Sequence, residues 1–240
     1  FLVDDYDKPE TSVYGGDVLT PNLDRMAREG MTLTNAHMTS TVCTPSRYTC
    51  LTGRYAGAST CEYYLRENPL GQQGAPAFNV ELEPDNMNVG QVLKDNGYAT
   101  GFVGKWGVGT PGTEGAPHRQ GFDFAYGFYD QLRAHGFYPN YMMRNGVCEP
   151  LPANYGFDMQ HVYAHTSGKT ENVYDAEGHL LAKGVSDPEK AVYSEHLFRK
   201  EAVDFIRRNH QKPFFLYYAT QLPHGPCIVP ELGVYRDRPW

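Results

Sequence analysis

Three short apolar runs, each followed directly or closely by a charged or imidazole side chain, constrain the fold of this chain more than any other feature. They are FLV at 1–3, ATGFVG at 99–104 and FFLYYAT at 214–220. Short, continuously apolar runs are typical of strands buried on both faces of a sheet. Expected helices separate them, as the crossover connections of parallel strands require. The sequence therefore predicts an α/β fold with a mostly parallel central sheet covered on both faces.

The segments between these runs carry helix start and stop signals. The expected helices cover residues 20–30, 45–51, 85–96 and 193–209. Residues 31–38 alternate in the manner of a strand. From 109 to about 187 the pattern gives way to Gly, Pro, Tyr and Asn, which indicates long loops and small hairpins.

The bulk composition excludes some classes of function. The chain of 240 residues has 21 basic and 28 acidic side chains and a net charge of -7, so no general basic field exists to hold nucleic acid. No apolar run approaches the length of about 20 residues that a membrane span needs. The first and last residues read as the middle of a fold, and we expect the chain to be incomplete at both ends.

The groups at the ends of the three runs are chemically distinctive. They are Asp4 and Asp5, Lys105, and His224. The carboxyl ends of parallel strands share one edge of a sheet, where ligands bind, so we expect these groups to converge there. Two adjacent carboxylates need a cation or protonation, and hard divalent ions take carboxylate oxygens. A capped turn is the alternative reading of Asp4 and Asp5.

Cys43 is the cysteine with the most informative surroundings. It stands just before the expected helix at 45–51, with Arg47 one turn on, and both the helix amides and the guanidinium would stabilise a negative charge. The five cysteines include no Cys-x-x-Cys pair, which argues against a zinc ribbon. A thiolate nucleophile and a disulfide with Cys50 or Cys61 both remain open. We expect Cys50 to face the core.

A longer motif surrounds Cys43. The pattern C-x-P-S-R at 43–47, followed after four residues by TGR at 52–54, resembles the signature of the type I, formylglycine-dependent sulfatases. Further segments resemble that family, and they are 20–30, 97–109, 120–128, 133–145 and 213–226. The resemblance, to arylsulfatase A-like and bacterial carbohydrate sulfatases, implies an alkaline-phosphatase-like α/β/α sandwich. It also implies a single, truncated catalytic domain over 1–240 with a substrate-facing insertion at about 109–187.

The resemblance implies a specific fate for Cys43. In sulfatases a dedicated formylglycine-generating or sulfatase-maturating enzyme oxidises this cysteine to formylglycine, an aldehyde that is hydrated to a geminal diol. One diol oxygen attacks sulfur and expels the alcohol, and the second hydroxyl then releases the sulfate. Asp4, Asp5 and the modified Cys43 resemble ligands of the family's metal, which is usually Ca²⁺, with Mg²⁺ as an alternative.

The resemblance also implies roles for the cationic groups. Arg47 would hold the formylglycine and offset its charge, and Lys105 would contact the oxygens of the sulfate. His224 would bind the substrate and donate a proton to the leaving alkoxide, a role worth about 10²–10⁴-fold. Arg133 and His135 are weaker candidates for substrate binding.

Two departures from the family pattern stand out. Many relatives carry a His where this chain has Gly107, so another base serves, turnover is slow, or activity is lost. His37, His118 and His135 are candidate substitutes. The family also completes its metal site with an Asp-Asn pair after a later strand. The pairs at 85–86 and 95–96 are expected to cap a helix, which would place the missing ligands and a second Lys beyond the last residue.

The function predicted from these features is hydrolysis of an aryl sulfate or, as natural substrate, a carbohydrate sulfate ester. A phosphonate or phosphodiester hydrolase of the same superfamily is one alternative. A non-catalytic homologue that binds sulfated glycans is the other, and Gly107 motivates it. By analogy with the family, we expect a periplasmic or secreted bacterial protein rather than a lysosomal one.

Overall fold

The fold was analysed in a computed structural model of the chain. It describes residues 1–40, 42–61, 81–131, 133–154, 173–174, 180–182, 190–225, 227 and 229–238. In the expected insertion at 109–187, most residues from 155 onwards therefore lie outside the described part of the chain.

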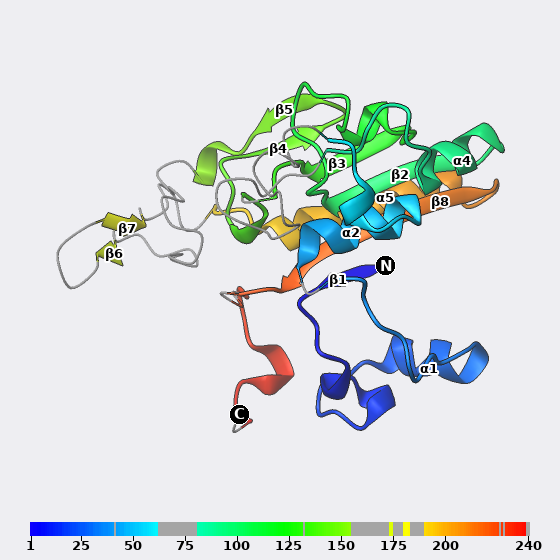
Figure 1. Ribbon diagram of the computed structural model, residues 1–240. Coiled ribbons are helices and arrows are strands. Elements are labelled where there is room, and N and C mark those ends of the chain that lie inside the picture. The colour runs from blue at the N-terminus through cyan, green and yellow to red at the C-terminus, as the bar shows by residue number, and fades with distance from the viewer. Residues whose placement is uncertain are drawn as a thin grey trace.

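A six-stranded sheet forms the centre of the molecule, in the order β1-β8-β2-β3-β4-β5 (Figure 1). Its strands are β1 (Leu2–Asp4), β8 (Phe214–Pro223), β2 (Ala99–Lys105), β3 (Phe124–Phe128), β4 (Tyr141–Arg144) and β5 (Val147–Pro150). The first four run parallel to one another, β4 pairs antiparallel with β3, and β5 pairs antiparallel with β4. The predicted mostly parallel sheet is confirmed, with its three expected strands as direct neighbours. A separate two-stranded ribbon pairs β6 (Val173–Tyr174) with β7 (Leu180–Ala182).

Four α-helices are present in the described residues: α1 (Pro21–Glu29), α2 (Cys43–Thr52), α4 (Val89–Asp95) and α5 (Ser194–Asn209). The short 3-10 turns are η1 (Lys8–Glu10), η2 (Ser12–Tyr14), η3 (Ala56–Ala58), η4 (Pro117–Arg119), η5 (Arg133–His135), η6 (Pro152–Asn154) and η7 (Gly233–Tyr235). All four expected helices are confirmed within a few residues at their ends. Among the described residues, no helix has both the length and the apolar composition that a membrane crossing requires.

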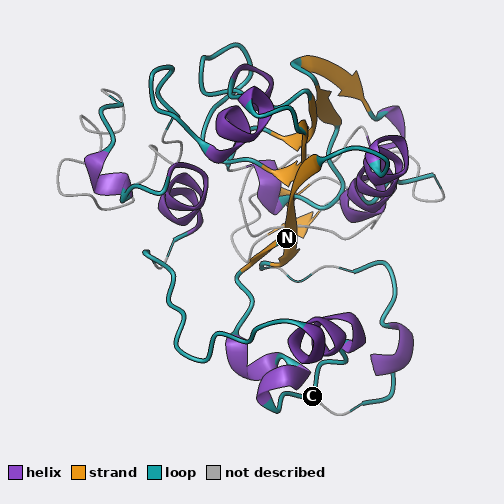
Figure 2. Cartoon of the chain, turned by 90° about the vertical axis from the view of Figure 1, so that its right-hand side faces the viewer, coloured by secondary structure: helices purple, strands orange, loops and turns teal. Residues whose placement is uncertain are grey.

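Alternating residues of the strands pack against helices on opposite faces of the sheet. On one face Phe102 of β2 joins a buried cluster with Tyr48 and Leu51 of α2. On the other face Val103, the next residue of β2, packs in a cluster with Phe198 of α5. Helices accordingly lie on both sides of the strands (Figure 2). This is the layered α/β/α arrangement that the apolar runs predicted.

Glu83 ties α2 to the loop that precedes α4. Its buried carboxylate accepts hydrogen bonds from the hydroxyls of Tyr48 (3.0 Å) and Ser59 (2.6 Å) and from the side-chain amide of Asn86 (2.9 Å). Because a buried charge is stable only when hydrogen-bonded, this network fixes the position of α2 beside the sheet. The N-cap of α4 is Asn88, whose side chain accepts from the amides of Gly90 and Gln91. The expected cap at 85–86 is therefore wrong by two residues.

Three local expectations were wrong. Residues 31–38 form no strand and are exposed, so their alternation does not mark a buried face. The loop region expected at 109–187 contains β3, which is a buried strand of the sheet. Cys50 is exposed and does not face the core.

The segment around α1 lies apart from the sheet, on the same side as the C-terminal residues (Figure 1). No residue of α1 itself is buried. The amide of Leu19 donates to the hydroxyl of Tyr235 at 2.7 Å, which links this segment to the C-terminal turn.

Candidate active site

Three neighbouring strands deliver their terminal side chains to one edge of the sheet. Asp4 is the last residue of β1, Lys105 is the last residue of β2, and His224 directly follows β8, which lies between them. The ammonium of Lys105 is completely buried and lies 2.6 Å from Oδ2 of Asp4. The predicted convergence of these groups on one rim is confirmed.

The start of α2 adds Cys43 and Arg47 to this rim. Cys43 is the first residue of the helix, and Arg47 lies one turn on. The guanidinium of Arg47 is 1% exposed, lies 3.2 Å from Oδ1 of Asp4 and donates to the backbone carbonyl of Lys105. The thiol of Cys43 lies 3.5 Å from Nζ of Lys105. All five cysteines fall in the described residues and are free thiols, so the disulfide alternative for Cys43 is not supported.

The charge of Asp4 is held by these two cations. Burial raises the pKa of the Asp4 carboxyl, but the positive charges of Lys105 and Arg47 outweigh that effect and lower the pKa below its usual value of 3.8. Asp4 is therefore ionised at neutral pH. It fixes the directions of both cationic side chains, because each of its oxygens faces one of them.

His224 and His135 form a stacked pair beside Lys105. Their ring centroids are 4.1 Å apart with an angle of 23° between the planes. Nδ1 of His224 lies 2.7 Å from the carbonyl oxygen of Gly225, and its Nε2 lies 3.2 Å from Oδ2 of Asp5. Both nitrogens of His224 thus face oxygen atoms, which fixes the orientation of the ring. Nε2 of His135 lies 3.1 Å from Nζ of Lys105.

Asp5 reaches His224 through an unusual backbone conformation. Its φ is 58°, in the left-handed region that Asp and Asn adopt more readily than other residues with side chains. The chain therefore turns sharply at the end of β1, and consecutive carboxylates take different partners. Asp4 faces Lys105 and Arg47, whereas Asp5 is half-exposed and faces His224.

The two carboxylates fit the oxygen-binding divalent ion that the sequence resemblance implies. Asp4, Asp5 and Cys43 line one open pocket of about 170 Å³. Carboxylates are the type of ligand that Ca²⁺ and Mg²⁺ prefer, although in this structure both oxygens of Asp4 face Arg47 and Lys105. This pocket is the place where those three residues would hold the ion.

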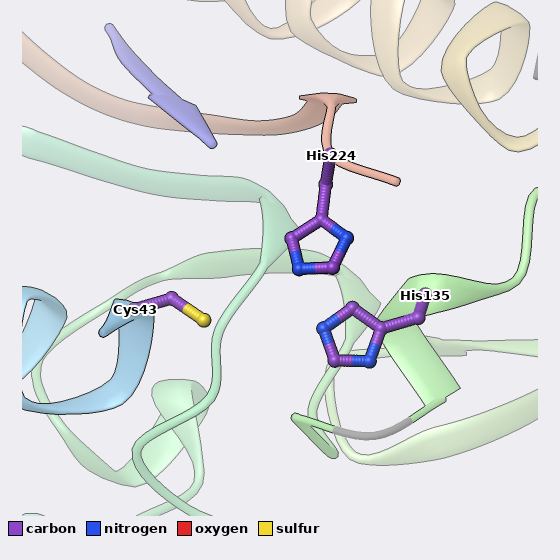
Figure 3. A group of neighbouring side chains, drawn as sticks. All are labelled: Cys43, His135 and His224. Atoms are coloured by element: carbon purple, nitrogen blue, oxygen red, sulfur yellow. The ribbon is translucent and has the colours of Figure 1, made fainter. Parts of the chain in front are cut away.

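A second group of ligand atoms lies close by, on Cys43, His135 and His224. These atoms lie within 4.8 Å of one another, and the three side chains point toward a common space (Figure 3). Nζ of Lys105 lies 3.5 Å from the sulfur and 3.1 Å from Nε2 of His135. The same ammonium lies 2.6 Å from Oδ2 of Asp4, so it borders both this group and the carboxylates, and an anionic substrate would meet its charge there.

Not every candidate residue joins the rim. Arg133 is exposed, and its guanidinium lies over the ring of Tyr141, 5.4 Å from the centroid. His37 is exposed and contacts Asn35, and His118 stacks on Tyr129. Of the three candidate substitutes for an imidazole at position 107, His135 is the one that contacts Lys105.

The sequence reading missed Gln131. This residue follows β3, is 3% exposed, and its side-chain nitrogen lies 2.7 Å from the sulfur of Cys43. A glutamine in a loop carries no pattern that signals such a role. Only the identification of β3 as a strand of the parallel sheet would have placed the residues after it at the same rim.

The sequence comparisons bear directly on this cluster. A family model described as Sulfatase matches residues 1–232. The chain belongs to the sulfatase family. One relative is the N-acetylgalactosamine-6-O-sulfatase of Bacteroides thetaiotaomicron, which is 33% identical over 260 residues covering 95% of this chain and 48% of the relative.

Solved structures share the fold of this sulfatase chain. One, from work on glycosaminoglycan metabolism by Bacteroides thetaiotaomicron, matches with a TM-score of 0.64 and 24% identity over 94% of this chain and 50% of that one. A second is BT4656 in complex with its substrate D-glucosamine-2-N,6-O-disulfate, with a TM-score of 0.57 and 22% identity over 93% of this chain and 34% of that one. The fold is therefore the alkaline-phosphatase-like α/β fold of sulfatases. The chain spans 32% to 48% of the length of the first curated relatives that it matches.

Proposed function

We propose that the protein of which this chain is part hydrolyses a sulfate ester of a carbohydrate, with Cys43 converted to formylglycine. The observation that carries the proposal is the cluster of Asp4, Arg47, Lys105 and His224 around Cys43 in a chain of the sulfatase family. A cysteine at a helix start, surrounded by buried cations, has the surroundings that the reaction of an anionic ester requires.

Two cationic side chains bind and orient charge in this proposal. Lys105 contacts the oxygens of the sulfate group, because its ammonium lies at the centre of the rim, 3.5 Å from the sulfur of Cys43. Arg47 is held rigidly by Asp4 and by the backbone of Lys105, and it offsets negative charge on residue 43. Preorganised donors of this kind stabilise charge without having to reorganise during the reaction.

His224 supplies the proton for the leaving alcohol. Its imidazole ring lies at the rim with Nε2 3.2 Å from Oδ2 of Asp5 and a ring nitrogen within 4.8 Å of the Cys43 sulfur, which places a group able to donate a proton beside residue 43. His135 stacks on this ring and contacts Lys105, so it borders the space where the sulfate oxygens would lie. We assign both histidines to substrate binding. Arg133 stays a candidate only for contacts farther along a sugar chain.

Asp4, Asp5 and residue 43 would hold a divalent cation, with Ca²⁺ as the proposed ion and Mg²⁺ as the alternative. When bound, such an ion supplies Lewis-acid stabilisation of negative charge on oxygen. The hydrated formylglycine supplies the nucleophilic oxygen. A formylglycine-generating or sulfatase-maturating enzyme is the partner that this chemistry requires, and we propose a periplasmic or secreted location.

The substrate class rests on the relatives. One is named an N-acetylgalactosamine-6-O-sulfatase, and a structural neighbour was solved with a disulfated glucosamine. We therefore propose a sulfated amino sugar or a related sulfated glycan. We also propose that residues 1–240 belong to one catalytic domain, in which loops within about 109–187, rather than the sheet strands in that range, face the substrate.

The proposal is tested on the full-length protein, coexpressed with a maturating enzyme. We expect the intact mass to fall by about 18 Da relative to the unconverted thiol form, and sulfate to be released from sulfated amino sugars. Turnover of matched aryl sulfate and aryl phosphonate esters should favour the sulfate. A retained thiol with binding of sulfated glycans would contradict the proposal, as would preference for the phosphonate.

Substitution of His224 by glutamine is expected to affect poor leaving groups most. Turnover of a sugar sulfate should fall by about 10²–10⁴-fold, because an alkoxide needs a proton as it departs. Turnover of 4-nitrophenyl sulfate should fall less, since a nitrophenolate leaves without one. His210→Gln is the matched control, because His210 is exposed at the opposite end of β8. Equal losses on both substrates would remove the assignment of His224 as the acid.

A further inference from the structure

The space beside Gly107 is already filled by the side chain of another residue. A Cβ atom added to Gly107 would lie 2.5 Å from Oε1 of Gln131 and 3.4 Å from Cδ of Arg47. The first separation is shorter than van der Waals contact permits. The φ of Gly107 is 73°, which further disfavours any residue with a side chain. A larger residue at 107 would therefore displace the Gln131 side chain.

Gln131 extends from this position to the sulfur of Cys43. Its Nε2 lies 2.7 Å from Sγ, closer than Nζ of Lys105 at 3.5 Å. The side chain is 3% exposed, so water competes little for the contact. Gln131 belongs to the segment between β3 and η5, and β3 pairs with β2, whose last residue is Lys105. Two neighbouring strand ends thus each aim a nitrogen donor at the same atom.

The chemistry of an amide defines what Gln131 can do at this position. In the converted protein, the sulfur's place on Cβ of residue 43 is taken by oxygen. A side-chain amide donates a hydrogen bond to such an oxygen, but it does not accept a proton in the working range of pH. Gln131 can therefore orient the reactive group, whereas proton transfer is left to the nearby imidazoles.

We propose that Gln131 is a positioning residue for the reactive group on residue 43, and that position 107 is glycine because Gln131 occupies the space beside it. Only the expected effect of Gln131 on turnover rests on the proposed function. The contact between Gln131 and residue 43 is a property of the unconverted chain as well. The tests below therefore separate the two proposals.

The first test measures alkylation of Cys43 by iodoacetamide in full-length protein made without a maturating enzyme. Gln131→Met keeps the length of the side chain and removes the donor that stabilises the attacking thiolate. We expect alkylation at residue 43, followed by peptide mass, to slow by about 3- to 10-fold. Exposed Cys148 serves as an internal standard. An unchanged rate would overturn the proposal.

The matched control is Gln120→Met. Gln120 is also a buried glutamine, but its side chain bonds to Asn88 and to the backbone of Leu82 and Glu114. We expect this variant to lower the melting temperature without slowing alkylation at Cys43. If both variants slow alkylation equally, the effect is one of general packing and the proposal fails. Gln131→Ala replaces Gln131→Met if the latter does not fold.

The second test uses the mature, full-length enzyme. We expect Gln131→Met to lower kcat by at least about tenfold with little change in KM, because misorientation of residue 43 affects the reaction rather than binding. The shape of the pH profile should match that of the parent, since an amide adds no titrating group. The proposal would be overturned if Gln131→Met had the same kcat as the parent. It would also be overturned if the acidic or the basic side of the pH–rate curve disappeared in this variant.

The third test asks why position 107 is glycine. Gly107→Ala should lower the melting temperature more in the parent than in a Gln131→Ala background, because the shorter side chain no longer meets the new Cβ. The strain of a positive φ is present in both backgrounds and cancels. Equal decreases would overturn the assignment of this space to Gln131. Absence of sulfatase activity in the mature parent would defeat the proposed function, while the alkylation and melting experiments would still decide the role of Gln131.

Discussion

Replacing Cys43 with alanine is expected to reduce sulfate-ester hydrolysis by the mature full-length protein on the order of 10⁶-fold, the scale seen when a catalytic nucleophile is removed. The physical reason is that formylglycine forms from the cysteine side chain, whose sulfur lies 3.5 Å from Nζ of Lys105 and within 4.8 Å of a ring nitrogen of His224. Alanine keeps the helix start of α2 intact, so the loss should not reflect unfolding. Sulfate release is measured together with the melting temperature.

Cys50→Ala is the matched control for Cys43→Ala. Cys50 lies on the same helix, is a free thiol and is exposed. We expect its removal to leave both activity and the conversion of Cys43 unchanged, with the mass decrease of about 18 Da retained. Substantial hydrolysis by Cys43→Ala would show that the reaction uses another nucleophile, and the proposed function would then lose its central residue.

The sequence predicted the rim of the site because strand ends obey a simple rule. In a parallel sheet the carboxyl ends share one edge, and the apolar runs before Asp4, Lys105 and His224 were recognisable as strands. Cys43 and Arg47 could be placed near them only through the family motif. The local amino-acid composition does not predict that the start of α2 packs against the end of β1.

Other parts of the site could not be predicted because they depend on contacts between distant segments. Gln131 and His135 lie in irregular chain after β3, and the strand itself was hidden in a region rich in Gly and Tyr. The restriction at Gly107 arises from a side chain 24 positions away in the sequence. Local patterns carry no information about which side chain will occupy a given space.

The orientation of α2 shows why the expectation for Cys50 was wrong. Pro45 and Ser46 in the first turn of this helix are buried, and the remaining buried residues, Thr44, Arg47, Tyr48 and Leu51, follow the spacing of one helical stripe. Thr44 and Arg47 are polar members of this stripe. Arg47 is buried because it pairs with Asp4. A hydrophobic pattern therefore does not reveal the stripe, and Cys50 falls outside it.

Asp4→Asn is expected to lower the free energy of unfolding by about 3–5 kcal/mol, the range for breaking a buried ion pair. The melting temperature should fall by about 6–20 °C for a chain of this size. Asp4 is 3% exposed and lies between Lys105 and Arg47, which are equally buried, so an uncharged side chain leaves two cations without their shared counter-charge. Urea or thermal unfolding with a chelator present measures this effect without a contribution from metal.

The dependence of that loss on pH tests its electrostatic origin. The pKa of Asp4 is lowered in the folded chain, because Lys105 and Arg47 outweigh the effect of burial, so its contribution to stability is fully present above the ordinary value of 3.8. The contribution is lost as the pH falls through the lower folded pKa, and parent and Asp4→Asn should then converge. Glu114→Gln, which breaks the exposed pair with Arg119, should cost at most about 1 kcal/mol. A cost for Asp4→Asn no larger than this control would mean that the carboxylate does not hold the two cations in place, and the rigid charge arrangement argued for the rim would have no support.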